Sequence, residues 1–381
     1  MVEPAGTDDS LPARLRELAR RVRPPAREGV RVLILPGVMG SILGVRGSPL
    51  DDVLWLDPVR VALGQLDRLS LDDARPGPVE PLGVFLPTYL RLKLTLELAG
   101  FDAGYVAWDW RRGLEAAAAR LAEAIDALAE GTTVHLVAHS MGGLVAHALL
   151  ASELPARRRV GSVVTLGTPS YGAPSMALVL QGSHPTVGGL ARLDPRRDPQ
   201  LLAARLFASF ESTHLLLPWI PPWTGLDLDA PSSWTAHLPG PRPGLLALAR
   251  AEQARVAAGR APHAARVLQV LGAGQRTVVG LERAQDGALA PVLGDDGDGT
   301  VPLALAHLEG AGATWYAEVR HGALPSDGEV CAAVVDLLTS GSTERLPTTW
   351  SPGAAKPAAA EEEVAGPWAE VRRLLSEFVS S

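Results

Sequence analysis

The sequence predicts an α/β domain with a mostly parallel sheet flanked by helices, and three observations lead to this prediction. Apolar, β-branched runs alternate with amphipathic helical runs along much of the chain. Residues 133–143 pass from an apolar run into His-Ser-Met-Gly-Gly, and a helix-forming run follows at once. The 381 residues are 47% hydrophobic and 20% charged, which fits one large α/β domain with insertions, or two domains.

The core is expected to begin at residue 29, after a short Arg-rich helix (11–22) and a proline-bearing linker within residues 1–28. Its first part, residues 29–172, lacks clear periodicity between residues 45 and 85. Elsewhere β-branched runs predict strands and amphipathic runs predict helices. We expect strands at 30–35, 105–108, 133–138 and 159–166, and helices at 88–99, 114–130 and 144–154.

The alternation of strands and helices breaks over residues 173–262. Trp219, Trp223 and Trp234 stand there among several prolines and leucines. An insertion of this kind over the carboxyl ends of the strands would form a cap. We therefore predict a tryptophan-rich cap over this range.

The second part of the core is expected over residues 263–340, with strands at 265–271 and 313–319 and a helix at 329–339. Residues 341–366 are rich in Pro, Ala, Ser and Glu, which is typical of a flexible linker. Residues 367–381 predict a last amphipathic helix. We expect it to dock back onto the body of the protein.

Charge and cysteine content exclude several classes of function. The net charge is −7 and the basic residues are scattered, so no nucleic-acid surface is expected. Cys331 is the one cysteine, so no internal disulfide forms and nothing requires an oxidising compartment. No apolar run approaches ~18 residues and no secretory h-region is visible, so we expect no transmembrane helix and a cytoplasmic location.

Ser140 is the candidate nucleophile. A strand, a sharp turn and a helix around a serine form a nucleophile elbow, whose crowded turn requires small neighbours. Gly142 stands two residues after Ser140, and Ala138 stands two before it, where the usual pattern has glycine. An alternative interpretation is a serine in a glycine-rich turn after a buried strand.

A candidate acid lies in the Gly- and Asp-rich segment 294–302, between two predicted strands. The order Ser, acid, His along the chain favours Asp298, with Asp296 as second choice. Clustered carboxylates also suggest calcium, but the spacing differs from an EF-hand loop and no Glu closes it. We therefore expect no metal site.

His321 is the candidate base, because it follows the last predicted strand and enters a loop at the edge of the sheet. His307 is the rival, but it lies close to Asp298 in sequence and on an apolar stretch. His139 precedes Ser140, so its side chain should point away from the serine. We predict a packing or hydrogen-bonding role for His139.

These residues would act together in acyl transfer. His321 would take the Ser140 proton and return it to the leaving alcohol, and Asp298 would hold the imidazole. The backbone N–H groups of Val38 and Met141 are the candidate oxyanion donors. This chemistry requires no metal or organic cofactor.

Five motifs in order resemble the lecithin:cholesterol acyltransferase family. They include an oxyanion loop, a tryptophan-bearing segment near the lid, an Asp-Trp-Arg stretch, a Gly-x-Pro turn and the acid motif. His321 falls where the histidine loop of that family should be. The motifs are residues 35–41, 54–57, 108–111, 166–173 and 297–302.

The resemblance implies an α/β-hydrolase fold, with Trp55 in substrate binding. It also implies a serine-dependent O-acyltransferase or lipase acting on lipid esters with a phospholipid-type donor. Ala138 departs from the family pattern, and Cys331 alone cannot clamp a lid as a cysteine pair does in the animal members.

Two other functions stay open beside this one. They are a soluble carboxylesterase or thioesterase for small esters, and a catalytically idle interaction module. We expect a lipid or acyl-ester substrate and leave open a transient contact with a membrane surface. The sequence does not determine the oligomeric state.

Overall fold

The computed structural model describes residues 30–351, together with residues 19 and 21, except at 48–49, 74–76, 195–197, 220–222, 224–225, 261–262 and 264–265. The helix expected over 11–22 lies outside the described residues apart from 19 and 21, as does the helix expected over 367–381. Of the linker expected over 341–366, only residues 341–351 are described.

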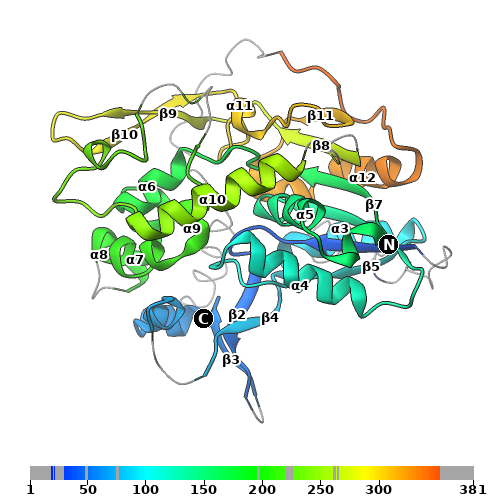
Figure 1. Ribbon diagram of the computed structural model, residues 1–381, viewed down its shortest axis with the longest axis horizontal. Helices are drawn as coiled ribbons and strands as arrows, with labels where there is room; N and C mark the ends of the chain where they lie inside the picture. The colour runs from blue at the N-terminus through cyan, green and yellow to red at the C-terminus, as the bar shows by residue number, and fades with distance from the viewer. Residues whose placement is uncertain are drawn as a thin grey trace, which may run out of the picture.

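Six parallel strands form the central sheet in the order β11-β8-β7-β6-β1-β5 (Figure 1). The predicted parallel sheet is confirmed, and β7 and β6 are its two central strands. The strands are β1 (Val30–Leu35), β5 (Asp102–Tyr105), β6 (Thr133–His139), β7 (Val160–Leu166), β8 (Val267–Gly272) and β11 (Ala313–Ala317).

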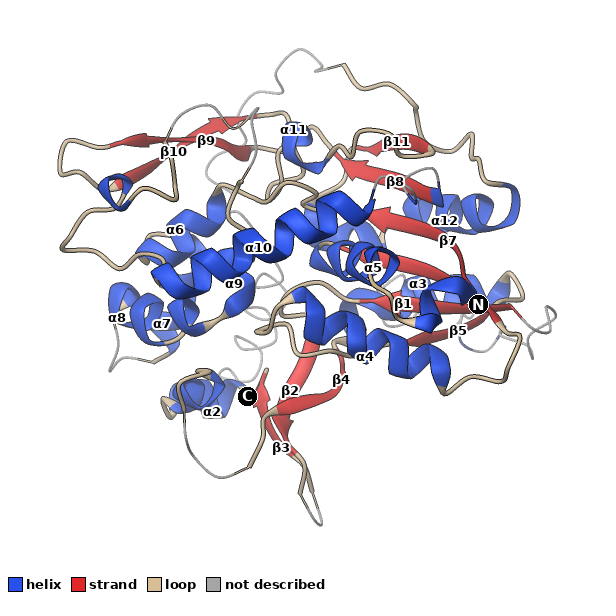
Figure 2. Cartoon of the chain, viewed as in Figure 1, coloured by secondary structure: helices blue, strands red, loops and turns tan. Residues whose placement is uncertain are grey.

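Helices cover both faces of this sheet (Figure 2). One face carries α4, α5 and α10, whose apolar side chains pack with the sheet in one cluster. The opposite face carries α3 and α12 in a second cluster, which includes buried Cys331. These helices are α3 (Leu86–Leu98), α4 (Leu114–Asp126), α5 (Met141–Ala151), α10 (Pro243–Arg260) and α12 (Gly328–Ser340).

The strand predicted over 105–108 was placed too late, because β5 ends at Tyr105. Trp108 leaves the sheet, since its backbone N–H donates to Ser41 Oγ at 3.2 Å and its indole N–H donates to the Pro36 carbonyl at 3.0 Å. These two hydrogen-bond partners lie more than sixty residues away in sequence. An apolar sequence pattern alone therefore could not locate the end of this strand.

A small antiparallel sheet occupies the segment that showed no periodicity. Its strands are four or five residues long and contain bulges, which explains why alternation was not visible. Two short helices follow its second strand. The elements are β2 (Ser41–Val45), β3 (Asp52–Trp55), β4 (Glu80–Val84), α2 (Pro58–Ala62) and η1 (Gln65–Leu69).

Arg111 links the segment that contains the small antiparallel sheet to the core. The guanidinium is 2.7 Å from Asp109 Oδ2 and donates to the carbonyls of Leu69 at 2.8 Å and Val79 at 3.1 Å. Arg111 is buried, and a buried charge requires a nearby opposite charge, which the Asp109 carboxylate supplies. Asp109 is therefore the ion-pair partner of Arg111.

Several short helices and the long helix α10 lie between β7 and β8 along the chain, and Figure 1 shows α6 to α9 grouped beside the sheet. After β8 the chain also forms an antiparallel hairpin that the sequence did not predict. The remaining elements are α6 (Ser175–Gln181), α7 (Pro185–Leu193), α8 (Pro199–Arg205), η3 (Phe207–Ser209), α9 (Glu211–Leu215), η4 (Pro231–Ser233), β9 (Thr277–Arg283), β10 (Leu289–Gly294), α11 (Leu303–Ala306), η2 (Pro155–Arg159) and η6 (His321–Ser326).

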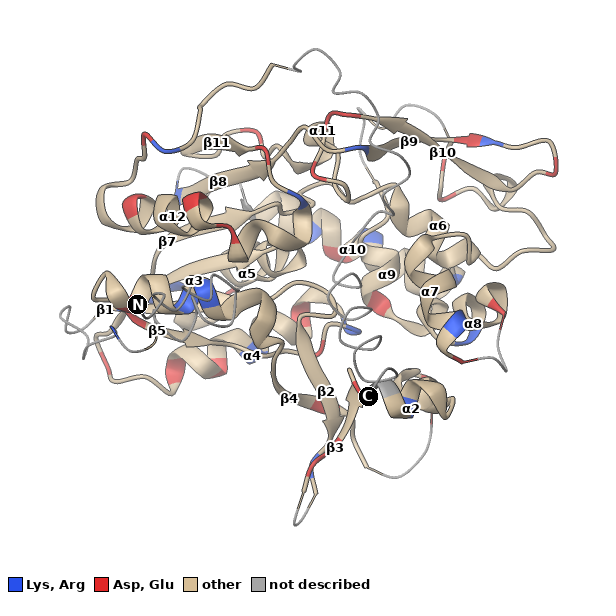
Figure 3. Cartoon of the chain, turned by 180° about the vertical axis from the view of Figure 1, so that it is seen from behind, with Lys and Arg blue, Asp and Glu red and all other residues tan. Residues whose placement is uncertain are grey.

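Residues of both charge signs are interspersed along the helices and loops in Figure 3. Within the part of the chain that the structure describes, no helix combines the length and apolar character needed to span a bilayer.

Candidate active site

Ser140 lies between β6 and α5 with φ 56° and ψ −129°, a conformation that non-glycine residues rarely adopt. Two hydrogen bonds hold it there. The Ser140 N–H donates to the Leu166 carbonyl at 2.9 Å, and Thr168 Oγ1 donates to the Ser140 carbonyl at 3.0 Å. The next strand along the sheet thus holds the strained turn in place, as a nucleophile elbow requires.

Small residues are necessary around Ser140. A Cβ atom on Gly142 would lie 2.7 Å from the Leu35 carbonyl oxygen, and one on Gly37 would lie 2.7 Å from Ser140 Cβ. Ala138 is fully buried in β6, so a methyl group is accommodated at this position. The departure from the usual glycine therefore leaves the elbow geometry intact.

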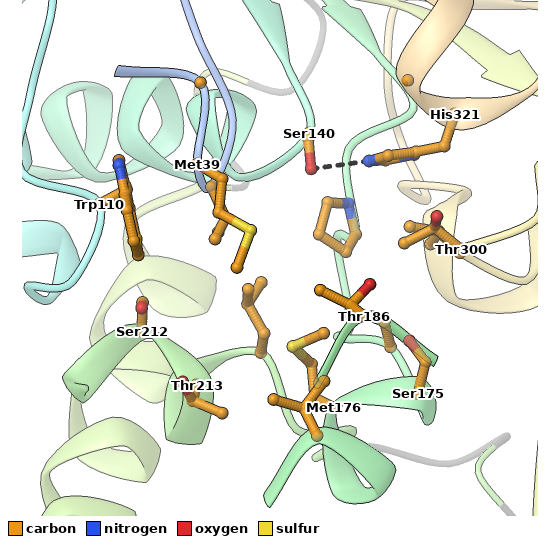
Figure 4. Close-up of a pocket in the computed structure, with 18 of the residues that line it drawn as sticks. Met39, Trp110, Ser140, Ser175, Met176, Thr186, Ser212, Thr213, Thr300 and His321 are labelled. Carbon is orange, nitrogen blue, oxygen red and sulfur yellow. Dashed lines mark hydrogen bonds between the residues drawn. The ribbon is translucent and has the colours of Figure 1, made fainter. Parts of the chain in front are cut away.

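The structure brings together the three residues predicted as nucleophile, base and acid. Figure 4 shows the contact between Ser140 and His321. His321 Nε2 lies 2.9 Å from Ser140 Oγ, and His321 Nδ1 lies 2.6 Å from Asp298 Oδ2. The His321 N–H also donates to the Asp298 carbonyl at 2.8 Å. With Nδ1–H directed at the carboxylate, Nε2 is free to accept the serine proton.

Asp298 is buried, and both of its carboxylate oxygens accept hydrogen bonds. Oδ1 accepts hydrogen bonds from the N–H groups of Val301 at 2.7 Å and Thr300 at 3.0 Å. The alternatives Asp296 and His307 are both exposed and stand outside this hydrogen-bonded chain. Among the described residues, no three His, Cys, Asp or Glu side chains are grouped as metal ligands.

The predicted oxyanion loop follows β1 and borders the same cavity as Ser140. The Gly40 N–H donates to the Gly37 carbonyl at 3.0 Å, which closes a turn with Met39 at φ 63°. Val38 lies inside this turn. Met141 is the first residue of α5, so its N–H has no carbonyl within the helix to bond.

Trp55 was expected to bind substrate, but it is not among the residues that line the cavity. It is 5% exposed, and its indole N–H donates to the Met39 carbonyl at 3.0 Å. Its ring meets Trp110 edge to face, with centroids 5.3 Å apart. Trp55 therefore supports the strained turn of the oxyanion loop through its hydrogen bond to Met39 and does not border the cavity.

Tyr89 and His139 join the oxyanion loop to the histidine loop. The Gly37 N–H donates to Tyr89 Oη at 3.0 Å, and Tyr89 Oη lies 2.9 Å from His139 Nδ1. His139 Nε2 lies 2.9 Å from the His321 carbonyl, which can only accept. His139 therefore donates from Nε2 and accepts the Tyr89 hydroxyl at Nδ1.

Both members of this bridge are neutral. Burial, reinforced by the nearby His321, lowers the pKa of His139 to about 3, and burial raises the pKa of Tyr89 above its ordinary value. The hydrogen-bonding role predicted for His139 is confirmed. The role of Tyr89 was not predicted from the sequence. The one feature that could have indicated it is a tyrosine, with its hydroxyl group, on the buried face of a helix.

A cavity of about 150 Å³ opens below Ser140 and His321. Its walls are mainly apolar and aromatic, with Trp110 and Phe210 on one side and Met176 on another (Figure 4 labels Trp110 and Met176). Ligand pockets for drug-sized molecules are usually ~300–1,000 Å³. The cavity as described is therefore suited to a short, mainly apolar group.

A family model described as a PGAP1-like alpha/beta domain matches residues 111–179, which include Ser140 and α5. No protein of curated function matches the sequence. Among solved structures, the Tle4–Tli4 complex matches with a TM-score of 0.53 at 15% identity, covering 84% of this chain and 99% of that chain. The chain has the α/β-hydrolase fold.

Two further solved structures resemble the chain less closely. The mature lipase BlEst2 of Bacillus licheniformis has a TM-score of 0.42 at 13% identity, covering 84% of this chain and 96% of that chain. EstA from Clostridium botulinum has a TM-score of 0.39 at 12% identity, covering 88% and 95%.

Proposed function

We propose that this chain is a serine-dependent ester hydrolase of the lipase/esterase type, which works through an acyl-serine intermediate. One observation carries this proposal. A continuous hydrogen-bonded chain runs from Ser140 Oγ through the His321 ring to Asp298, with both distances below 3.0 Å. A serine hydroxyl is a weak nucleophile by itself, and this arrangement supplies the base it needs.

In the first half of the reaction, Ser140 Oγ attacks the ester carbonyl while His321 Nε2 takes the hydroxyl proton. Asp298 stabilises the imidazolium and stays ionised. The carbonyl oxygen becomes an oxyanion, to which the Val38 and Met141 N–H groups would donate. The tetrahedral intermediate then collapses, the alcohol leaves with the proton from Nε2, and Ser140 carries the acyl group.

In the second half, a water molecule gives a proton to His321 Nε2 and attacks the acyl-serine carbonyl. Collapse of the new intermediate returns the proton to Ser140 Oγ and releases the carboxylic acid. An alcohol in place of water would give an acyltransferase. The motifs shared with lecithin:cholesterol acyltransferases support this second reaction, with a phospholipid-type acyl donor.

The cavity bears on the choice between lipid esters and small esters. Its apolar walls suit an acyl chain, but its volume of about 150 Å³ suits a short one. Residues 173–262, which we propose as the cap, supply Met176, Thr213 and Leu216 to these walls. A long acyl chain would therefore require the cap to move, whereas a small ester would not.

The test is hydrolysis of p-nitrophenyl esters from acetyl to palmitoyl by the wild type, by Ser140→Ala and by the control Ser340→Ala. We expect Ser140→Ala to lose activity about 10⁴-fold or more, and Ser340→Ala, at the exposed end of α12, to keep it. Short-chain preference would support the small-ester form of the proposal. Long-chain activity would support lipid esters, and alcohols should then be tested as acceptors.

A wild type that is inert on every ester and unlabelled by a fluorophosphonate would contradict this proposal. The chain would then be better explained as an interaction module.

A further inference from the structure

Ser175 presents a buried hydroxyl without a protein partner in the cavity below Ser140. It is the first residue of α6 and is 3% exposed. Within the described residues, Ser175 Oγ has no hydrogen-bond partner. An unsatisfied buried hydroxyl is destabilising, and most buried polar groups in folded proteins are paired. A bound molecule in the cavity could supply the missing partner.

The hydroxyl faces the space in which the reaction would occur. In Figure 4 the Ser175 oxygen lies on the side of its side chain that faces Thr186 and Ser140. Ser175 lines the same cavity as Ser140 and His321. A group attached to Ser140 through an ester bond would therefore share this space with the Ser175 hydroxyl.

The remaining lining determines the charge of the group that fits. Among the described residues, no Asp, Glu, Lys or Arg side chain lines the cavity. His184 lines it, but burial lowers the pKa of this histidine to about 4, and its Nδ1 accepts the Thr186 N–H at 3.2 Å. Neutral walls of this kind disfavour an ionic group and admit an uncharged one.

We propose that Ser175 is a specificity-determining residue, and that the preferred ester has a short acyl group bearing one neutral oxygen, a carbonyl or a hydroxyl, that pairs with Ser175 Oγ. The inference rests on the proposed ester hydrolysis and names its substrate class. The apolar walls contact the carbon chain, and the serine hydroxyl recognises the oxygen. An acyl group without that oxygen leaves the hydroxyl unpaired, which is how a polar contact discriminates between substrates.

The experiment compares p-nitrophenyl esters in pairs that differ by one oxygen: pentanoate with 4-oxopentanoate, hexanoate with 5-oxohexanoate, and butanoate with 3-hydroxybutanoate. We expect the wild type to favour the oxygenated member of at least one pair by about 10-fold in kcat/KM. Ser175→Ala should reduce that ratio to about 1 while changing kcat/KM for the plain ester less than about 3-fold. Ser212→Ala, which removes a hydroxyl from the α9 wall of the cavity, is the matched control and should keep the ratio.

The melting temperature of the Ser175→Ala variant distinguishes a role of Ser175 in substrate recognition from a structural role. Because Ser175 Oγ bonds to no described protein group, Ser175→Ala should not lower the melting temperature of the free protein. Equal rates within all three pairs for the wild type would overturn this inference and leave ester hydrolysis standing, with ordered water as the partner of Ser175. A preference that survives Ser175→Ala would also overturn it. A wild type that cleaves no ester would contradict the proposed function itself.

Discussion

At the scale of single residues, the site depends on side chains that hold the reacting groups rather than on the reacting groups alone. The bridge from Gly37 through Tyr89 and His139 to His321 connects the two loops between which the substrate carbonyl must lie. Its three contacts are between 2.9 and 3.0 Å. Since Val38 directly follows Gly37, the bridge also sets the position of the proposed oxyanion donor.

Tyr89→Phe should therefore lower kcat. The phenylalanine keeps the ring but leaves the Gly37 N–H and His139 Nδ1 without their partner. We expect kcat and kcat/KM to fall together by about 10-fold, because an oxyanion contact is made in the transition state rather than with bound substrate. Rates should be expressed per fluorophosphonate-titrated site, so that misfolded protein is not counted.

Tyr316→Phe, in β11 and outside the site, is the matched control and should leave kcat unchanged. A Tyr89→Phe variant with normal kcat per titrated site would show that the bridge only stabilises the fold.

At the scale of elements, the nucleophile elbow packs directly against the end of β1, and the absence of a side chain at Gly142 permits this close approach. The backbone of Gly142 at the start of α5 passes so close to the end of β1 that a Cβ atom would lie 2.7 Å from the Leu35 oxygen and 2.8 Å from the Pro36 oxygen. Both obstacles are backbone atoms, which cannot rotate away. The strand end, the turn and the helix are therefore positioned as one unit.

Gly142→Ala should separate the elbow from the oxyanion loop. Overpacking of this kind costs typically about 1–3 kcal/mol, and we expect a lower melting temperature with at least a 10-fold loss of kcat/KM. Gly189→Ala in α7 is the control, because apart from its neighbours and the backbone of its own helix no atom lies within 4 Å of the added methyl group. Alanine favours a helix over glycine by up to about 1 kcal/mol, so this control should be neutral or stabilising. Equal behaviour of the two variants would refute the steric argument.

At the scale of the whole molecule, the site is assembled from segments distributed along more than two-thirds of the chain. Gly37 follows β1, Ser140 follows β6, and Asp298 and His321 come from loops on either side of β11. His139 lies where these segments meet and is buried in its neutral form. Protonation of this histidine is therefore coupled to the stability of the entire fold.

The free energy of unfolding should fall on acidification. His139 has a pKa of about 3 in the folded protein, against an ordinary value of 6.5. Between these values the unfolded chain binds more protons, so stability increases with pH and is lost as the pH falls below 6.5 toward 3. We expect a contribution of about 2 kcal/mol between pH 8 and pH 5.

Urea unfolding of the wild type and of His139→Gln at several pH values across this range measures the effect. The glutamine variant can still donate and accept, but it does not titrate, so its stability should depend less on pH. Identical pH dependence in the two proteins would mean that other groups control acid stability.

The sequence by itself determined the α/β class and the residues to examine. Helical and strand periodicity is a local property, so the six strands and the helices α3, α4, α5 and α12 could be placed within a few residues. The helix α10 was not predicted, because it lies in the range assigned to the cap. Ser140, Asp298 and His321 could be selected because the elbow is a local motif and because the order of the three along the chain is restricted in this fold. The assignment of Trp55 to substrate binding relied on family resemblance and did not agree with its buried position.

Only the tertiary structure decided which side chains meet. The Tyr89–His139 contact joins residues fifty positions apart, and the His139–His321 contact joins residues 182 positions apart. The small antiparallel sheet and the unpaired hydroxyl of Ser175 likewise depend on neighbours that are distant in sequence. Periodicity reports which face of an element is buried but not what covers that face, so these contacts became visible only when the elements were packed together.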